Sequence, residues 1–164
     1  MYNIGDKIVY PMHGAGIIES IEEREILGEK QDYYVLKMPA RDMQVMIPIN
    51  NVTLAGIREV VDEDVFDKVV ELFQENMDLD STTANWNKRY RENMTKIRGG
   101  DIFEVADVVK SLMLRDNQKG LSTGEKKMLT SARQILISEL VLAKNIPEEK
   151  VEEMICQFLK VEEA

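Results

Sequence analysis

The chain has 164 residues, 44% hydrophobic and 31% charged, with a net charge of -9 at pH 7. This length can bury one good core or two small ones, and the charge content argues against a membrane protein. No apolar run reaches the roughly 20 residues that span a bilayer, and the first twelve residues do not resemble a signal peptide, so we expect a cytoplasmic protein. Bulk charge also excludes a protein that coats nucleic acid, since such binding needs many phosphate contacts.

The first third of the chain alternates apolar and polar residues in short runs, which predicts β-strands. Turn residues such as His13-Gly14 and Leu27-Gly28 separate the runs. We therefore predict a small N-terminal domain over residues 1–57, either a strongly bent antiparallel sheet or an SH3-like barrel. An exposed edge strand of such a sheet can pair with another protein. The predicted strands are residues 7–10, 15–18, 33–36 and 45–49.

From Val61 onward the apolar period becomes helical, and start and stop residues divide this part into five helices. We predict that they form a helical domain over residues 61–164, so that the fold class is α+β. The helix starts are marked by the acidic Asp62–Asp64, Asn85, Asp101, Ser122 and Pro147, and the stops by Gly99-Gly100, Gly120 and Asn145.

Residues 85–100 are basic although the whole protein is acidic, and they contain its only tryptophan. Five cations face one anion, Glu92, which gives this segment a charge of about +4. One interpretation is a small, local contact with nucleic acid. The other is a solvated amphipathic helix whose apolar residues form an ordinary core stripe. The cations are Lys88, Arg89, Arg91, Lys96 and Arg98, and the apolar residues are Trp86, Tyr90, Met94 and Ile97.

Residues with catalytic or metal-binding potential are sparse. His13 is the only histidine, and no Ser or Cys nucleophile stands in a recognisable context. Gly14-Ala15-Gly16 lacks the spacing of a phosphate-binding loop, and the single Cys156 excludes an intramolecular disulfide. We expect no catalysis, no cofactor, no metal and no small-molecule substrate.

Three motifs occur in one order along the chain: GDKIVYPMHGAG at residues 5–16, NWNKRY at residues 85–90 and GLSTGEKKML at residues 120–129. Together they resemble the CarD/CdnL family of bacterial transcription regulators, and the resemblance spans nearly the whole chain. It implies an N-terminal domain that binds the RNA polymerase β subunit and a helical domain that contacts promoter DNA at the upstream fork of the transcription bubble. It also implies that the protein stabilises open promoter complexes and is not an enzyme.

The resemblance also implies roles for individual residues. Arg24 matches a polymerase-contacting arginine of the family, whereas Met46 stands where a second basic contact is expected. Trp86 matches a minor-groove wedge at the edge of the bubble. The other expected DNA contacts are Lys88, Arg89, Arg91 and Lys126.

A rival interpretation remains open at this point. The protein could be an adaptor that binds the polymerase and never touches DNA, with Trp86 as a core residue. The two interpretations differ in where the structure places the Trp86 side chain.

Overall fold

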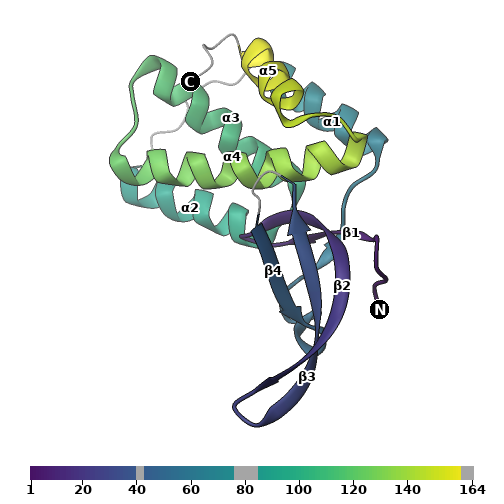
Figure 1. Ribbon diagram of the computed structural model, residues 1–164. Helices are drawn as coiled ribbons and strands as arrows, with labels where there is room; N and C mark the ends of the chain where they lie inside the picture. Colours follow the sequence, from purple (N-terminus) through teal and green to yellow (C-terminus); the bar gives the residue numbers. More distant parts are fainter. Residues whose placement is uncertain (40–42, 76–84, 160–164) are drawn as a thin grey trace.

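The computed structural model describes residues 1–39, 43–75 and 85–159. Within these ranges an antiparallel sheet is followed by five helices, which confirms the predicted fold class (Figure 1). The sheet has five antiparallel strands in the order β4-β3-β2-β1-β5. The strands are β1 (Lys7–Tyr10), β2 (Gly14–Ile26), β3 (Glu29–Met38), β4 (Met43–Pro48) and β5 (Arg58–Glu59), with a 3-10 helix η1 (Ile49–Asn51).

The strands β2 and β3 are longer than predicted, at 13 and 10 residues, because they continue past the core as a two-stranded arm (Figure 1). Charged and polar residues dominate the arm, and its few apolar side chains, such as Ile21 and Ile26, are exposed, so the alternation that identifies a half-buried strand is missing there. The arm turns at Leu27 and Gly28, both at positive φ (53° and 81°), which suits a tight hairpin. The short β5 was not predicted, since two residues carry no periodic signal.

The helices begin and end close to the predicted residues. The caps are local: Asn85 accepts a hydrogen bond from the amide of Lys88, and Ser122 accepts one from the amide of Glu125. Pro147 was expected as the first helical residue but immediately precedes the last helix, a shift of one position. The helices are α1 (Glu63–Gln74), α2 (Trp86–Gly99), α3 (Ile102–Gln118), α4 (Thr123–Lys144) and α5 (Glu148–Leu159).

Two apolar cores form, one among the helices and one on a face of the sheet. A third, smaller cluster joins them: Val9 and Ala15 on the other face of the sheet pack against Leu142 of α4. The sheet is therefore buried on both faces at its base, where it meets the helices, while the arm projects away from the body (Figure 1). This arrangement holds the sheet against α4 and leaves the arm and the outer face of α2 open to partners.

Candidate nucleic-acid and polymerase interfaces

The helix α2 carries Trp86 as its first residue, directly after the Asn85 cap. The indole is 42% exposed, so it is not a core residue. It does not project freely past the helix end either: it stacks on Tyr90 with ring centroids 5.1 Å apart, and its Nε1 donates a hydrogen bond of 2.9 Å to the Ser122 hydroxyl at the start of α4. The ring is thus held in one place while much of its surface stays open.

The start of α4 lies against this indole at Gly124. A methyl group added at Gly124 would lie 3.6 Å from the Trp86 ring and 3.7 Å from the Tyr90 ring, which is ordinary contact distance. The first turn of α4 therefore packs against both rings. Ser122 serves two elements at once, since its hydroxyl caps α4 and also accepts the indole N–H.

Close to this contact, α2 and α4 are also joined by an ion pair. Arg89 donates to both carboxylate oxygens of Glu125, at 3.1 and 3.3 Å, and the Glu125 side chain is only 3% exposed. Burial raises the pKa of Glu125, but the hydrogen bonds and charge of Arg89, together with the Ser122 bonds, outweigh burial and hold that pKa below its ordinary value. The carboxylate is therefore ionised at neutral pH.

The predicted DNA contacts take different positions around Trp86. Lys88 and Arg91 of α2 and Lys126 of α4 are exposed, and Lys88 lies 4.0 Å from Glu92. Arg89 instead points at α4 and is engaged by Glu125. Lys127, which the sequence did not single out, is exposed beside Lys126.

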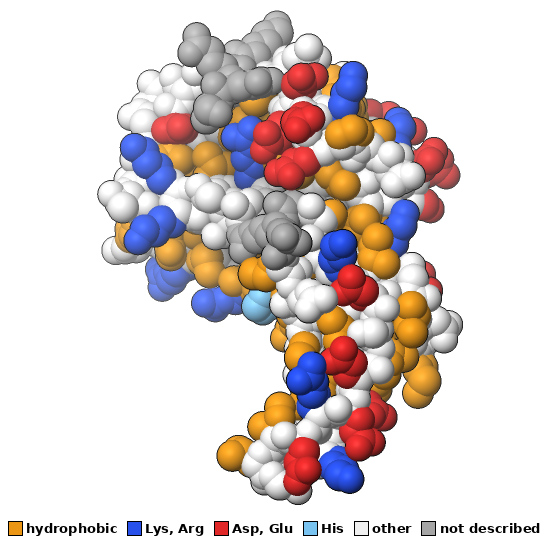
Figure 2. Space-filling view, in the orientation of Figure 1, with side chains coloured by type: hydrophobic (Ala, Val, Ile, Leu, Met, Phe, Trp, Pro, Cys, Tyr) orange, Lys and Arg blue, Asp and Glu red, His pale blue; other side chains and the backbone are white. Residues whose placement is uncertain are grey.

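The charged side chains separate across the helical domain. Figure 2 shows Lys and Arg side chains along α2 and the start of α4, whereas Asp and Glu gather toward α1 and α5. A cationic face beside a partly exposed indole is suited to a negatively charged backbone with accessible base edges. Because few cations take part, affinity for free DNA should be low.

The predicted polymerase contacts lie on one face of the sheet. Arg24 pairs with Gln31, and Met46 pairs with Val35. Gln31 and Val35 are four residues apart on β3, so their side chains and those of their partners share a face, about 13 Å apart along the strands. Met46 lies on the edge strand β4 and is 38% exposed. Arg24 is exposed and bonded at 2.8 Å to Glu22.

In the part of the chain that the structure describes, no group of three or more His, Cys, Asp or Glu could hold a metal ion. No described helix is long and apolar enough to cross a membrane.

Comparison with known proteins gives two family matches. Residues 2–61 match the CarD-like/TRCF RID domain, and residues 68–156 match the CarD C-terminal domain. A protein of Bacillus subtilis (strain 168) named "Putative transcription factor YdeB" is 46% identical over 151 residues, which are 92% of this chain and 97% of that protein.

The Arg89–Glu125 pair predicts a dependence of stability on pH. Because folding lowers the pKa of Glu125, the pair contributes its full stability above the ordinary glutamate pKa, about 4.3, and loses it as the pH falls below that value. Glu125→Gln should therefore lower the free energy of unfolding at pH 7, and the difference from the unaltered protein should shrink toward pH 3. Urea unfolding at both pH values measures this. A difference that is the same at both would contradict the assignment.

The Ser122 hydrogen bond predicts a change in tryptophan fluorescence. Ser122→Ala should move the Trp86 emission to longer wavelength and increase quenching by acrylamide, because the indole loses its only polar partner in the described structure. Loss of the helix cap should also cost about 1 kcal/mol of stability. Asp101→Ala is the matched control: it removes the cap of α3 and should leave the emission unchanged. Unchanged emission in Ser122→Ala would show that the bond does not hold the ring.

Proposed function

Since the chain belongs to the CarD family, we propose that it regulates transcription by binding RNA polymerase through its sheet and promoter DNA through the Trp86 end of α2. Its N-terminal domain is a CarD-like RNA-polymerase-interacting domain, and the protein is a transcription factor of this family, not an enzyme. A protein that works on bacterial RNA polymerase acts in the cytoplasm. The observation that carries the DNA part of the proposal is the partly exposed, anchored indole on the cationic face of an acidic protein.

On the polymerase side, we assign binding to the face that carries Arg24 and Met46, with the β subunit as the partner. The Arg24 guanidinium is exposed, and its Glu22 partner is also at the surface, so this ion pair is worth at most about 1 kcal/mol and a carboxylate of a partner can replace it. Met46 offers an apolar, adaptable contact on an open edge strand. This chemistry supports an interface with one charged anchor and one apolar anchor.

On the DNA side, we assign Trp86 to the upstream fork of the transcription bubble and Lys88, Arg91 and Lys126 to backbone phosphates. Separated strands leave an unstacked base step that an indole can cover from the minor groove, and closed duplex lacks that surface. Arg89 supports this site indirectly, because it fixes α2 to α4 through Glu125.

These contacts would act by differential binding. A protein that drives no reaction can shift the equilibrium between closed and open promoter complexes only by binding the open form better. A difference of about 1.4 kcal/mol changes that ratio tenfold. A single stacking contact is worth roughly 1 to 3 kcal/mol, so Trp86 alone is sufficient for a useful effect.

A second candidate function is a polymerase adaptor that makes no DNA contact. It would explain the sheet face equally well but gives no role to an exposed, hydrogen-bonded indole. Promoter footprinting with polymerase present separates the two, because only the first protects the upstream edge of the bubble.

Arg24→Glu should weaken binding to the polymerase β lobe at least tenfold, because it replaces an attractive charge with a repulsive one. Lys30→Glu is a matched control: it makes the same charge change on the opposite face of the same arm, where Lys30 pairs with Glu25. Binding to an isolated β-lobe fragment measures both variants. Equal loss in the two, or no loss in Arg24→Glu, would contradict the assigned face.

Trp86→Ala should shorten the lifetime of open complexes several-fold while leaving polymerase affinity unchanged. Stability should fall by only about 1 kcal/mol, from one hydrogen bond and one ring contact, because the side chain lies outside the core. A competitor challenge on one promoter measures the lifetime, and thermal unfolding measures the stability. An undiminished lifetime, or a loss of 3 to 5 kcal/mol as expected for a core aromatic residue, would refute the wedge.

The competitor challenge, repeated at several salt concentrations, distinguishes the contribution of the cations to open-complex lifetime from that of the indole. Reversing Arg91 and Lys126 together should reduce the salt dependence, by about 0.9 in the logarithmic slope for each phosphate that the variant no longer binds, whereas Trp86→Ala should leave the slope unchanged. Reversing Lys68 of α1 and Lys150 of α5, both exposed on the acidic side, is the matched control for net charge. A slope that changes equally in both double variants would contradict the phosphate contacts.

A further inference from the structure

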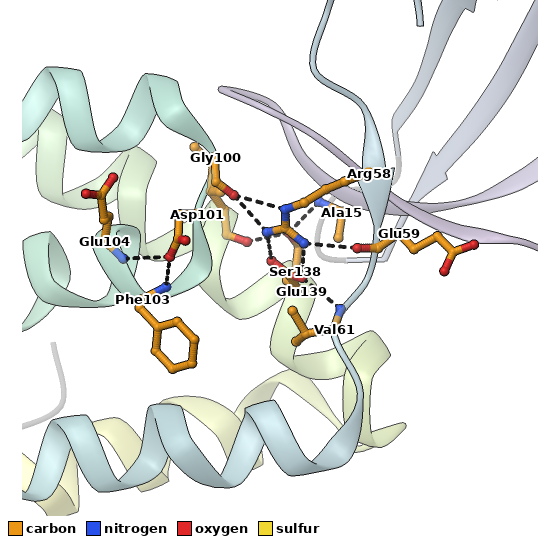
Figure 3. Close-up of polar contacts among 11 residues, drawn as sticks. Ala15, Arg58, Glu59, Val61, Gly100, Asp101, Phe103, Glu104, Ser138 and Glu139 are labelled. Atoms are coloured by element: carbon orange, nitrogen blue, oxygen red, sulfur yellow. Dashed lines mark hydrogen bonds and ion pairs between the residues drawn. The ribbon is translucent and has the colours of Figure 1, made fainter. Parts of the chain in front are cut away.

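The junction between sheet and helices is built around one arginine that sequence patterns did not single out. Arg58 of β5 donates two hydrogen bonds of 2.7 Å to the two carboxylate oxygens of Glu139 in α4, and Glu139 is 3% exposed. Its Nε and a terminal nitrogen donate to the Gly100 carbonyl at the end of α2, at 3.1 and 2.8 Å. A last bond goes to the Glu59 carbonyl, so all five N–H donors of the guanidinium are used (Figure 3).

Further hydrogen bonds between the sheet and α4 surround this ion pair. The amide of Ala15 donates to the Ser138 hydroxyl at 2.8 Å, and the amide of Val61 donates to Glu139 at 3.0 Å (Figure 3). Gly14 allows this approach: it adopts φ 109°, and a methyl group there would lie 2.8 Å from the Ser138 hydroxyl. Lys7 adds a bond of 3.0 Å to the Leu142 carbonyl. The sheet is therefore bonded to α4 through both backbone and side chains.

We propose that the Arg58–Glu139 pair is a positioning device that fixes the angle between the polymerase-binding sheet and the DNA-contacting helix α2. The inference rests on the proposed function and extends it to residues that touch neither polymerase nor DNA. Arg58 meets α2 at its C-terminal end, where Gly100 presents a carbonyl at the negative end of the helix dipole. Trp86 lies at the opposite end of the same helix.

The length of α2 makes the angle important. Its 14 residues at about 1.5 Å each place Trp86 about 21 Å from the junction. A tilt of about 5° at the junction then displaces the indole by about 2 Å, and misplacements of about 1 Å already have large effects on positioned groups. When the sheet is bound to polymerase, the local concentration of the indole at the fork depends on this angle being fixed.

The planar fork of arginine is essential to this arrangement. A lysine at the same position keeps the charge but cannot bond both Glu139 oxygens and the Gly100 carbonyl together. Arg58→Lys therefore loosens the angle without leaving a buried carboxylate unpaired. Ser138→Ala is a second, uncharged variant that removes the bond to Ala15. Asp107→Asn is the control, since it breaks an ion pair of 2.6 Å with Lys96 that joins α2 to α3 within the helices.

The first experiment tests whether the angle between the sheet and α2 is fixed. Spin labels at Leu27→Cys on the tip of the arm and Thr95→Cys on α2 are both at exposed positions, and the native Cys156 is buried. We expect the distribution of distances between them to broaden in Arg58→Lys, and less so in Ser138→Ala, but not in Asp107→Asn. Circular dichroism and a cooperative thermal unfolding transition confirm that each variant is folded; if Arg58→Lys does not fold, Ser138→Ala alone decides the outcome. An unchanged distribution in the folded junction variants would overturn the inference.

The functional consequence is measured with full-length protein, polymerase and one promoter. Affinity for the β lobe should stay within twofold of the unaltered protein, while the extension of open-complex lifetime should fall about three- to tenfold in Arg58→Lys, toward the value of Trp86→Ala. A junction variant that broadens the distances yet keeps the full lifetime would overturn the positioning role. If the unaltered protein itself fails to extend the lifetime, the proposed function is wrong instead, and the positioning role assigned here falls with it.

Discussion

Two buried carboxylates on one helix set the placement of the rest of the protein. Glu125 and Glu139 of α4 are 2% and 3% exposed, and a carboxylate so far from water must be paired. Arg89 of α2 reaches the first, and Arg58 of β5 reaches the second. The glutamates are 14 residues apart, close to four helical turns, so they lie on nearly the same side of α4 and about 21 Å apart. Because Arg58 also bonds Gly100, α2 is attached to α4 at both ends.

This double attachment explains how an acidic protein can present a local cationic site. The helix α2 contributes cations to both sides of itself: Arg89 is directed inward and neutralised, while Lys88 and Arg91 face solvent. Only the outward charges are available to phosphates, so intrinsic affinity for DNA is modest. A partner that holds the protein beside promoter DNA supplies the missing free energy as effective concentration, and a rigid attachment makes that contribution larger.

Local features of the fold could be predicted from the sequence, and features that join distant segments could not. The caps at Asn85, Asp101 and Ser122 are predictable because each bonds an amide two or three residues away. The Arg58–Glu139 pair spans 81 positions, and neither residue lies in a local sequence pattern that identifies the other as its partner. The only signal for Glu139 is a charged residue among the apolar positions of α4. The orientation of the Arg89 side chain could not be predicted either. The composition of the segment shows that a cation is present but not whether it faces solvent or a buried carboxylate.

The Trp86 side chain is intermediate between the two interpretations of the sequence, since it is neither buried in the core nor free. A core residue would be unavailable to a partner, and a free side chain would lose several rotamers on binding, at a cost of about 0.5 to 1.5 kcal/mol. Ser122 and Tyr90 remove much of that cost in advance, because they select one ring position while 42% of the indole stays exposed. The bond to Ser122 also satisfies the indole N–H, so an apolar contact through the exposed part of the ring leaves no polar group unpaired. Preorganisation of this kind favours recognition of the shape of a fork over its base sequence.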